Sequence, residues 1–206
     1  MSESKDIKVR LDHKVILEMI EPHSKVLDLG CGNGVLLSLL MEHNFCTGAG
    51  IEIDEQAIYK CFERGVSVSQ GNLDGGLDDY RDQCFDYVIL NESVQEVLNP
   101  QKVILEALRV GKKLIVGIPN FGHIDGRLQI FFGGQVPVTK WLPYKWYNTP
   151  NLRFLTLKDF RQFCQDKKIV IEQERALSLT LEINVMTNLF AHVGLFLLKK
   201  EVRSKK

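Results

Sequence analysis

The stretch that decides the fold is Lys25-Val26-Leu27-Asp28-Leu29-Gly30-Cys31-Gly32-Asn33-Gly34. From Val26 to Leu29 it is an apolar run interrupted only by Asp28, which is typical of a strand buried on both faces. An apolar helix is predicted to begin at Val35. Glycine at every second position between strand and helix permits positive φ angles and lets a ligand approach the backbone closely. Because the first N–H groups of a helix have no partners within that helix, the turn is predicted to bind a ligand with an anionic group.

Two ligand classes use such a turn, and its spacing helps to separate them. Dinucleotide sites favour G-x-G-x-x-G, but here Val35 stands where that pattern has Gly or Ala. Asp28 would repel a pyrophosphate, yet it suits a ligand that carries an ammonium or sulfonium charge beside its carboxylate. The pattern therefore favours S-adenosyl-L-methionine, or S-adenosyl-L-homocysteine, over a nicotinamide dinucleotide. A tight turn without a ligand is the remaining alternative.

Size and composition predict one globular domain over residues 1–206. The chain has 45% hydrophobic and 25% charged residues, with 26 Lys plus Arg against 26 Asp plus Glu. A net charge of zero creates no field that favours nucleic acid, so a small-molecule ligand is expected. There is no signal peptide pattern and no apolar run of about 18 residues, which favours a cytoplasmic protein without membrane contact.

The cysteine pattern argues against disulfides and zinc. The five cysteines are an odd number without a C-x-x-C pair, and no metal site is expected. Cys31 lies inside the glycine turn, where we interpret it as a small apolar filler rather than a reactive nucleophile.

The rest of the chain alternates predicted strands and helices. Apolar runs predict further strands at 45–53, 66–70, 85–90, 113–119, 168–175 and 191–199. Helical periodicity predicts helices at 6–20, 35–42, 55–64, 101–110 and 157–166, with another helix beginning at 93–98. This alternation predicts a mostly parallel α/β sheet, with the last two strands forming an antiparallel hairpin.

Polar residues at the carboxyl ends of these strands complete the predicted cofactor site. Glu52 lies about 20 residues past the turn, where an acid can accept both ribose hydroxyls. Asn72 can accept from an adenine amino group or simply stabilise its own turn, and Asp54 is predicted to cap a helix. The predicted cofactor-binding residues are Asp28, Gly30, Cys31, Gly32, Asn33, Gly34, Glu52, Ile53, Asn72, Leu73 and Asn91.

A long aromatic segment rich in glycine and proline, at about 120–155, breaks the alternation. It follows the fifth strand, so it is expected over the same sheet edge, either as a lid or substrate pocket or as a packed excursion or partner surface. His123 is the candidate base in this segment, with a hydrogen-bonded loop histidine as the alternative. Tyr144 and Tyr147 are candidates to shape a pocket, or else pack with neighbouring tryptophans.

The glycine turn, Glu52 and Asn72 together resemble the class I S-adenosylmethionine-dependent methyltransferases. More specifically, the motifs at 85–90, 110–113, 119–123, 137–140 and 142–151 resemble the methionine biosynthesis protein MetW family. The resemblance implies a three-layer, Rossmann-like fold with seven strands and helices on both faces. It also implies a role in methionine metabolism alongside homoserine O-acyltransferase. Relatives more often carry Asp at the position of Asn72.

Two functions from different classes follow from these observations. The first is a methyltransferase acting on a small metabolite, since a positioned sulfonium needs little further catalysis and a base is optional. The second is a non-catalytic or regulatory partner that activates homoserine O-acyltransferase. The fourth strand ends in Asn91-Glu92-Ser93-Val94 and lacks the [ND]-P-P-[FY] motif of many amino-group methyltransferases. A nicotinamide-dependent enzyme is disfavoured by Asp28 and Val35.

Overall fold

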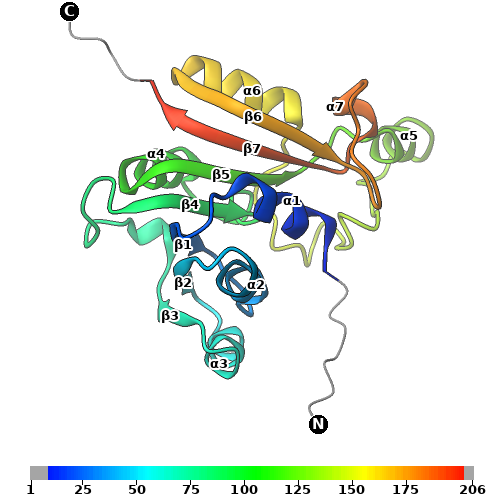
Figure 1. The fold of residues 1–206 in the computed structure, drawn as a ribbon. Coiled ribbons are helices and arrows are strands. Elements are labelled where there is room, and N and C mark those ends of the chain that lie inside the picture. Colours follow the sequence, from blue (N-terminus) through cyan, green and yellow to red (C-terminus); the bar gives the residue numbers. More distant parts are fainter. Residues whose placement is uncertain (1–8, 202–206) are drawn as a thin grey trace, which may run out of the picture.

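The computed structural model describes residues 9–201, so the first residues of the predicted helix 6–20 lie outside it. Its centre is a sheet in the order β3-β2-β1-β4-β5-β7-β6 (Figure 1). The strands are β1 (Lys25–Leu29), β2 (Thr47–Glu52), β3 (Ser67–Gln70), β4 (Phe85–Asn91), β5 (Gly111–Pro119), β6 (Ile169–Leu177) and β7 (Val193–Lys200). The first five strands are parallel, and β7 runs antiparallel to both β5 and β6. The predicted α/β class and terminal hairpin are confirmed.

Helices cover both faces of the sheet, as predicted. They are α1 (Leu11–Met19), α2 (Val35–His43), α3 (Glu55–Glu63), α4 (Pro100–Val110), α5 (Ile124–Gly133), α6 (Leu157–Asp166) and α7 (Thr187–Phe190). One buried cluster joins α1, α2 and Cys61 of α3 to side chains such as Ile115, and the other joins α4 and α6 to side chains such as Leu114 and Val116. Alternate residues of a strand thus enter different clusters, as the twofold repeat of a strand requires.

The helix predicted to begin at 93–98 is wrong, because this segment forms turns. Its backbone groups bond to other parts of the chain instead of to their own helix. The Asp74 carboxylate accepts from Leu98 N at 3.0 Å and from Asn99 N at 2.9 Å. The carbonyl of Gln95 accepts from Leu152 N and Arg153 N, which lie far along the chain.

Some predicted boundaries shift for local reasons. The second strand begins at Thr47 rather than at 45, because Phe45 has a positive φ of 53° and is exposed. Pro100 begins α4, one residue before the predicted start at 101, since proline fits the first helical position. The predicted cap at Asp54 is confirmed, because its side chain accepts from Gln56 N, and Thr156 forms a capping box with Asp159.

The segment at about 120–155 contains one helix that the sequence did not predict. This helix, α5, lies with α7 beyond the end of β5 and the start of β7 (Figure 1). The remainder, through Leu155, has neither helix nor strand. None of the helices between residues 9 and 201 has the length and apolar character that crossing a membrane would require.

Candidate functional site

The glycine turn between β1 and α2 has the backbone conformation that the sequence predicted. Gly30, Gly32 and Gly34 have φ angles of 76°, 54° and 73°, a region that other residues adopt only at a cost. A Cβ atom on Gly30 would lie 3.0 Å from Cβ of Ser93, and one on Gly34 would lie 2.9 Å from Sγ of Cys61. A Cβ atom on Gly32 would meet nothing within 4 Å. The first and third glycines therefore pack against the protein, whereas Gly32 faces open space.

Glu52, at the end of β2, binds the glycine turn directly. Its Oε2 accepts from Gly32 N at 2.8 Å, and its Oε1 accepts from Ile53 N and Asp54 N at 2.7 and 3.0 Å. Two acceptor positions on Oε1 are thus taken, while Oε2 keeps one for a further donor. To accept two ribose hydroxyls, Glu52 must release one of these backbone groups.

Asp28 is a buried carboxyl that faces the turn. Its residue surface is 3% exposed, and no hydrogen bond to its side chain is found among residues 9–201. Burial, and then the negative charge of Glu52, raises the pKa of Asp28 to about 7. A ligand cation placed beside this group would favour its ionised form.

Two neighbouring cavities follow the sheet edge and meet over the turn. The turn cavity, of about 360 Å³, has the walls Val9, Arg10, His13, Asp28, Gly30, Cys31, Gly32, Asn33, Val35, Leu36, Asn91 and Glu92. The edge cavity, of about 480 Å³, has the walls Gly30, Gly32, Ile51, Glu52, Ile53, Gly71, Asn72, Leu73, Asp74, Asn91, Glu92, Ser93, Glu96, Val97 and Leu98. Both volumes are in the range of small-molecule sites. Of the predicted cofactor residues, only Gly34 lines neither cavity.

The side chains of the edge cavity divide into apolar walls and polar ends. Ile51, Leu73 and Val97 are apolar and can flank a flat ring. The Asn72 side chain accepts from Asp74 N at 2.9 Å and caps a short 3-10 helix at Leu73–Gly75. This bond is the turn role considered for Asn72, and it occupies one acceptor position of its amide oxygen.

Several site residues were not predicted from the sequence. Arg10 donates to both oxygens of Asp12 at 2.9 and 2.8 Å and forms an ion pair with Glu92 across the turn cavity. Burial of Asp12 opposes its ionisation, but Arg10 and Asn91 outweigh this effect and lower its pKa. Glu92 has a positive φ of 58°, which is costly for a residue with a side chain and is common at functional sites. The one feature of the sequence that could have indicated Glu92 as a site residue is its position directly after the predicted fourth strand.

Two buried polar atoms at the turn cavity have no partner within residues 9–201, namely His13 Nδ1 and Asn91 Oδ1. Asn91 Nδ2 donates to Asp12 at 2.9 Å, and its Oδ1 is turned toward β5, where a Cβ atom on Gly117 would lie 2.1 Å from it. A buried polar atom without a partner costs about 1–3 kcal/mol. Asp28 is therefore the group in this cavity that best fits a ligand end carrying an ammonium group.

The candidate catalytic residues lie away from both cavities. Tyr144 lines a separate, small apolar cavity with Trp146 and Phe154, and Tyr147 is exposed. His123 is the N-cap of α5, where its Nδ1 accepts from Asp125 N at 3.1 Å. The structure therefore does not bring these three residues together with the glycine turn.

Comparison with solved structures identifies relatives of the fold. A SAM-dependent methyltransferase from Thermotoga maritima, described as a possible histamine N-methyltransferase, has a TM-score of 0.65 at 20% identity, covering 93% of this chain and 88% of its own. One from Archaeoglobus fulgidus has a TM-score of 0.62 at 15% identity, covering 91% and 94%. The [4+2]-cyclase SpnF has a TM-score of 0.65 at 18% identity, covering 92% and 80%. The likeness shows the fold alone, and a fold does not fix a reaction.

Sequence comparison is more specific. The family model of the methionine biosynthesis protein MetW matches residues 10–198. A bifunctional methionine biosynthesis protein MetXA/MetW from Rhodopirellula baltica is 36% identical over an alignment of 178 residues that covers 82% of this chain. The match spans only 29% of that relative's length. The chain therefore belongs to the MetW family of methionine biosynthesis proteins.

Proposed function

We propose that the chain binds S-adenosylmethionine across the turn and edge cavities and methylates a small metabolite. The observation that carries the proposal is the continuity of the two cavities over Gly30 and Gly32, with acids on both sides. Asp28 would hold the ammonium group, and Glu52 would accept from the ribose. Apolar walls at Ile51 and Leu73 would flank the adenine.

The N-terminus of α2 supports the placement of the amino-acid end. Val35 and Leu36 are the first residues of this helix and line the turn cavity. The first N–H groups of a helix lack partners within the helix and favour an anion such as a carboxylate. The bound cofactor supplies an activated methyl group on a sulfonium, so the residues of the chain have mainly to position an acceptor.

Calorimetric titration of Gly32→Val tests the proposed binding site. The new side chain would project from Gly32 into the space shared by both cavities, so affinity for S-adenosylmethionine and S-adenosylhomocysteine should fall by more than about 100-fold. The matched control is Gly65→Val, because Gly65 has a φ of 70°, open space around its Cβ position and no place in either cavity. Both variants bear a similar backbone cost of about 1–2 kcal/mol. Failure of the wild-type protein to bind either compound at millimolar concentration would reject the proposal.

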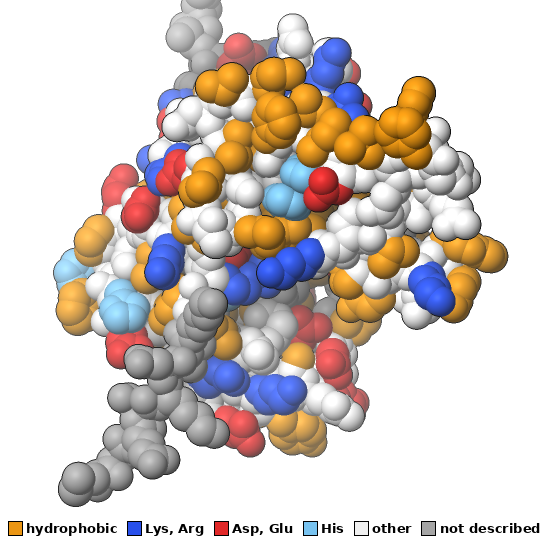
Figure 2. All heavy atoms as spheres, turned by 90° about the vertical axis from the view of Figure 1, so that its right-hand side faces the viewer, with side chains coloured by type: hydrophobic (Ala, Val, Ile, Leu, Met, Phe, Trp, Pro, Cys, Tyr) orange, Lys and Arg blue, Asp and Glu red, His pale blue; other side chains and the backbone are white. Residues whose placement is uncertain are grey.

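A second function, favoured by the Rhodopirellula baltica relative, is regulation of a partner enzyme. That relative is named as a bifunctional MetXA/MetW protein. The family resemblance implies homoserine O-acyltransferase as the partner. An exposed surface on the 120–155 segment supports this function, since Phe131, Phe132 and Trp146 are 80%, 79% and 73% exposed. Figure 2 shows this face, on which hydrophobic side chains gather.

Measurement of acyltransferase activity separates the two functions. If the chain is a regulatory partner, homoserine O-acyltransferase should co-purify with it and become more active in its presence. Phe131→Ser with Phe132→Ser should weaken this effect, because exposed aromatics contribute most to docking surfaces. The control is Tyr59→Ser, an exposed aromatic on α3. Acyltransferase activity that is the same with and without the chain would exclude this function.

A further inference from the structure

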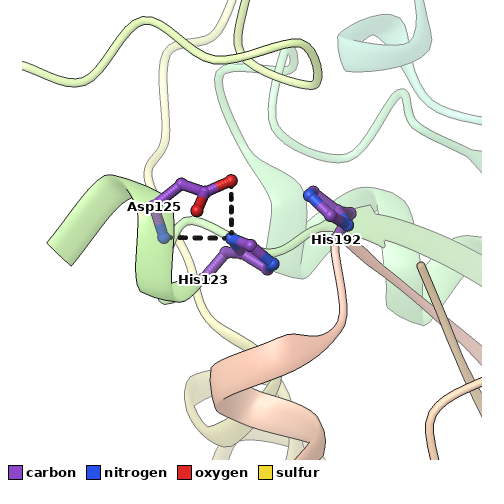
Figure 3. A group of neighbouring side chains, drawn as sticks. All are labelled: His123, Asp125 and His192. Carbon is purple, nitrogen blue, oxygen red and sulfur yellow. Dashed lines mark hydrogen bonds and ion pairs between the residues drawn. The ribbon is translucent and has the colours of Figure 1, made fainter. Parts of the chain in front are cut away.

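Three metal-ligating side chains from distant parts of the chain lie together at the sheet edge. His123 and Asp125 belong to the start of α5, and His192 lies just before β7 (Figure 3). One ligand atom from each of the three lies within 4.8 Å of the others. None of these residues lines the turn cavity or the edge cavity. The cluster is therefore separate from the proposed cofactor site, and its interpretation does not depend on that proposal.

The backbone beneath this cluster is firmly held. Pro119 of β5 pairs with Val193 of β7, and Asn120 N donates to the carbonyl of His192 at 2.7 Å. The buried side chain of Asn120 donates to the carbonyl of Ala191 at 2.8 Å and accepts from Gly122 N at 3.0 Å. The two histidine-bearing segments thus keep a fixed separation, as a metal site requires.

His123 and Asp125 already have the spacing of two ligands to one ion. His123 Nδ1 accepts from Asp125 N, so this nitrogen carries a lone pair rather than a proton. Oδ2 of Asp125 lies 3.5 Å from the same nitrogen. Zinc bonds of about 2.1 Å in a tetrahedral arrangement hold two ligand atoms roughly 3.4 Å apart. A cation between these two atoms would take the lone pair of His123 Nδ1 from the cap bond with Asp125 N and would form two metal bonds in its place.

His192 provides the third ligand. Its Nδ1 is buried and has no hydrogen-bond partner among residues 9–201. Its ring stacks on that of His123, with centroids 3.8 Å apart and an interplanar angle of 22°. Because a metal binds in the plane of an imidazole, the ring of His192 must turn about its side-chain torsions on binding. Burial and then His123 lower the pKa of His192, the Asp125 carboxylate opposes this effect, and Lys140 adds to it.

We propose that His123, Asp125 and His192 bind a divalent transition-metal ion of the zinc, cobalt or nickel class. A set of two imidazoles and one carboxylate binds these ions in preference to magnesium or calcium, which favour oxygen ligands. Three protein ligands leave a further coordination position for water or for an oxygen or nitrogen donor of a small molecule. The proposal departs from the expectation of no metal site, which rested on cysteine spacing. Spacing along the chain cannot show that residues 123 and 192 meet.

Cobalt titration tests this site, with absorption by bound Co²⁺ as the signal and Zn²⁺ as the competitor. The wild-type protein should bind one Co²⁺, and His192→Ala should weaken binding by about 100-fold or more. His123→Asn should do the same while preserving the cap, since an asparagine oxygen can accept from Asp125 N. Asp125→Asn changes an exposed residue and supplies a third variant that leaves packing intact. The control is His43→Ala, an exposed histidine at the end of α2.

Melting curves without metal establish that each variant is folded. Saturable Co²⁺ binding that all three ligand variants retain would place the ion elsewhere and overturn the proposal. Absence of saturable binding to the wild-type protein at about 1 mM Co²⁺ would also overturn it.

Discussion

Asp28→Asn is expected to weaken S-adenosylmethionine binding by about 100-fold and to raise the melting temperature at pH 8. The loss of affinity follows because a buried carboxylate facing a ligand ammonium contributes about 3 kcal/mol, and an amide lacks its charge. Calorimetry measures the first effect and a thermal melt of the ligand-free protein the second. The same substitution should leave affinity for adenosine nearly unchanged, since adenosine has no ammonium group.

The gain in stability follows from the pKa of Asp28. Burial, with Glu52 as the second cause, raises the folded-state pKa from 3.8 to about 7. The folded protein therefore holds a proton that the unfolded chain has released, and stability falls as pH rises from about 4 to 7, then levels off. A shift of about three units corresponds to an upper limit of roughly 4 kcal/mol, of which Asn should recover about 1–3 kcal/mol. The stabilisation should disappear near pH 4.

Asp54→Asn is the matched control for this substitution. Asp54 is exposed and caps α3, and asparagine caps a helix equally well. Its affinity and melting temperature should stay at the wild-type values. Unchanged affinity of Asp28→Asn would show that the carboxylate of Asp28 does not face the ligand. A lower melting temperature at pH 8 would show that burial does not raise the pKa of Asp28 in the folded protein.

Glu52→Gln is expected to weaken binding of both S-adenosylmethionine and adenosine by about 100-fold. A ribose hydroxyl donating to a carboxylate contributes about 1.5–3 kcal/mol, and Gln offers a donor where Glu52 Oε2 accepts from Gly32 N. Competition with a fluorescent adenosine analogue measures both affinities. The control is Glu55→Gln, at the exposed first residue of α3, and it should bind normally.

The two substitutions together distinguish the ends of the site. Asp28→Asn should lower the affinity for S-adenosylmethionine but not for adenosine, whereas Glu52→Gln should lower both affinities equally. If Glu52→Gln weakened S-adenosylmethionine alone, the ribose would lie elsewhere and the assignment of the edge cavity would be wrong.

The sheet and the glycine turn were predictable because their signals are local. A parallel strand buried on both faces is mostly apolar, as β1 is at Val26, Leu27 and Leu29, and the turn favours glycine where φ is positive. The position of the acids near the strand ends was also predictable, since parallel strands place their carboxyl ends at one edge of the sheet. Asp28 and Glu52 meet the glycine turn for this reason.

Other features of the fold and site could not be predicted from the sequence. They depend on contacts with residues distant in the chain, or they leave no periodic pattern of apolar residues. Residues 93–98 looked helical, yet the Asp74 carboxylate and residues 152–153 take their backbone groups. The helix α5 buries no apolar stripe, since Leu128, Ile130 and Phe131 are all exposed, so periodicity had nothing to detect. Arg10 and His13 reach the site from a helix whose sequence looks like any surface helix.

A crystal structure of the protein with S-adenosylhomocysteine tests the central claim most directly. The adenosine should lie between Ile51 and Leu73 with its ribose within hydrogen-bond distance of Glu52. The amino-acid end should lie over Gly32, with its ammonium group against Asp28. Ligand bound anywhere else, or cavities that stay free of ligand in crystals grown at millimolar concentration, would contradict the account.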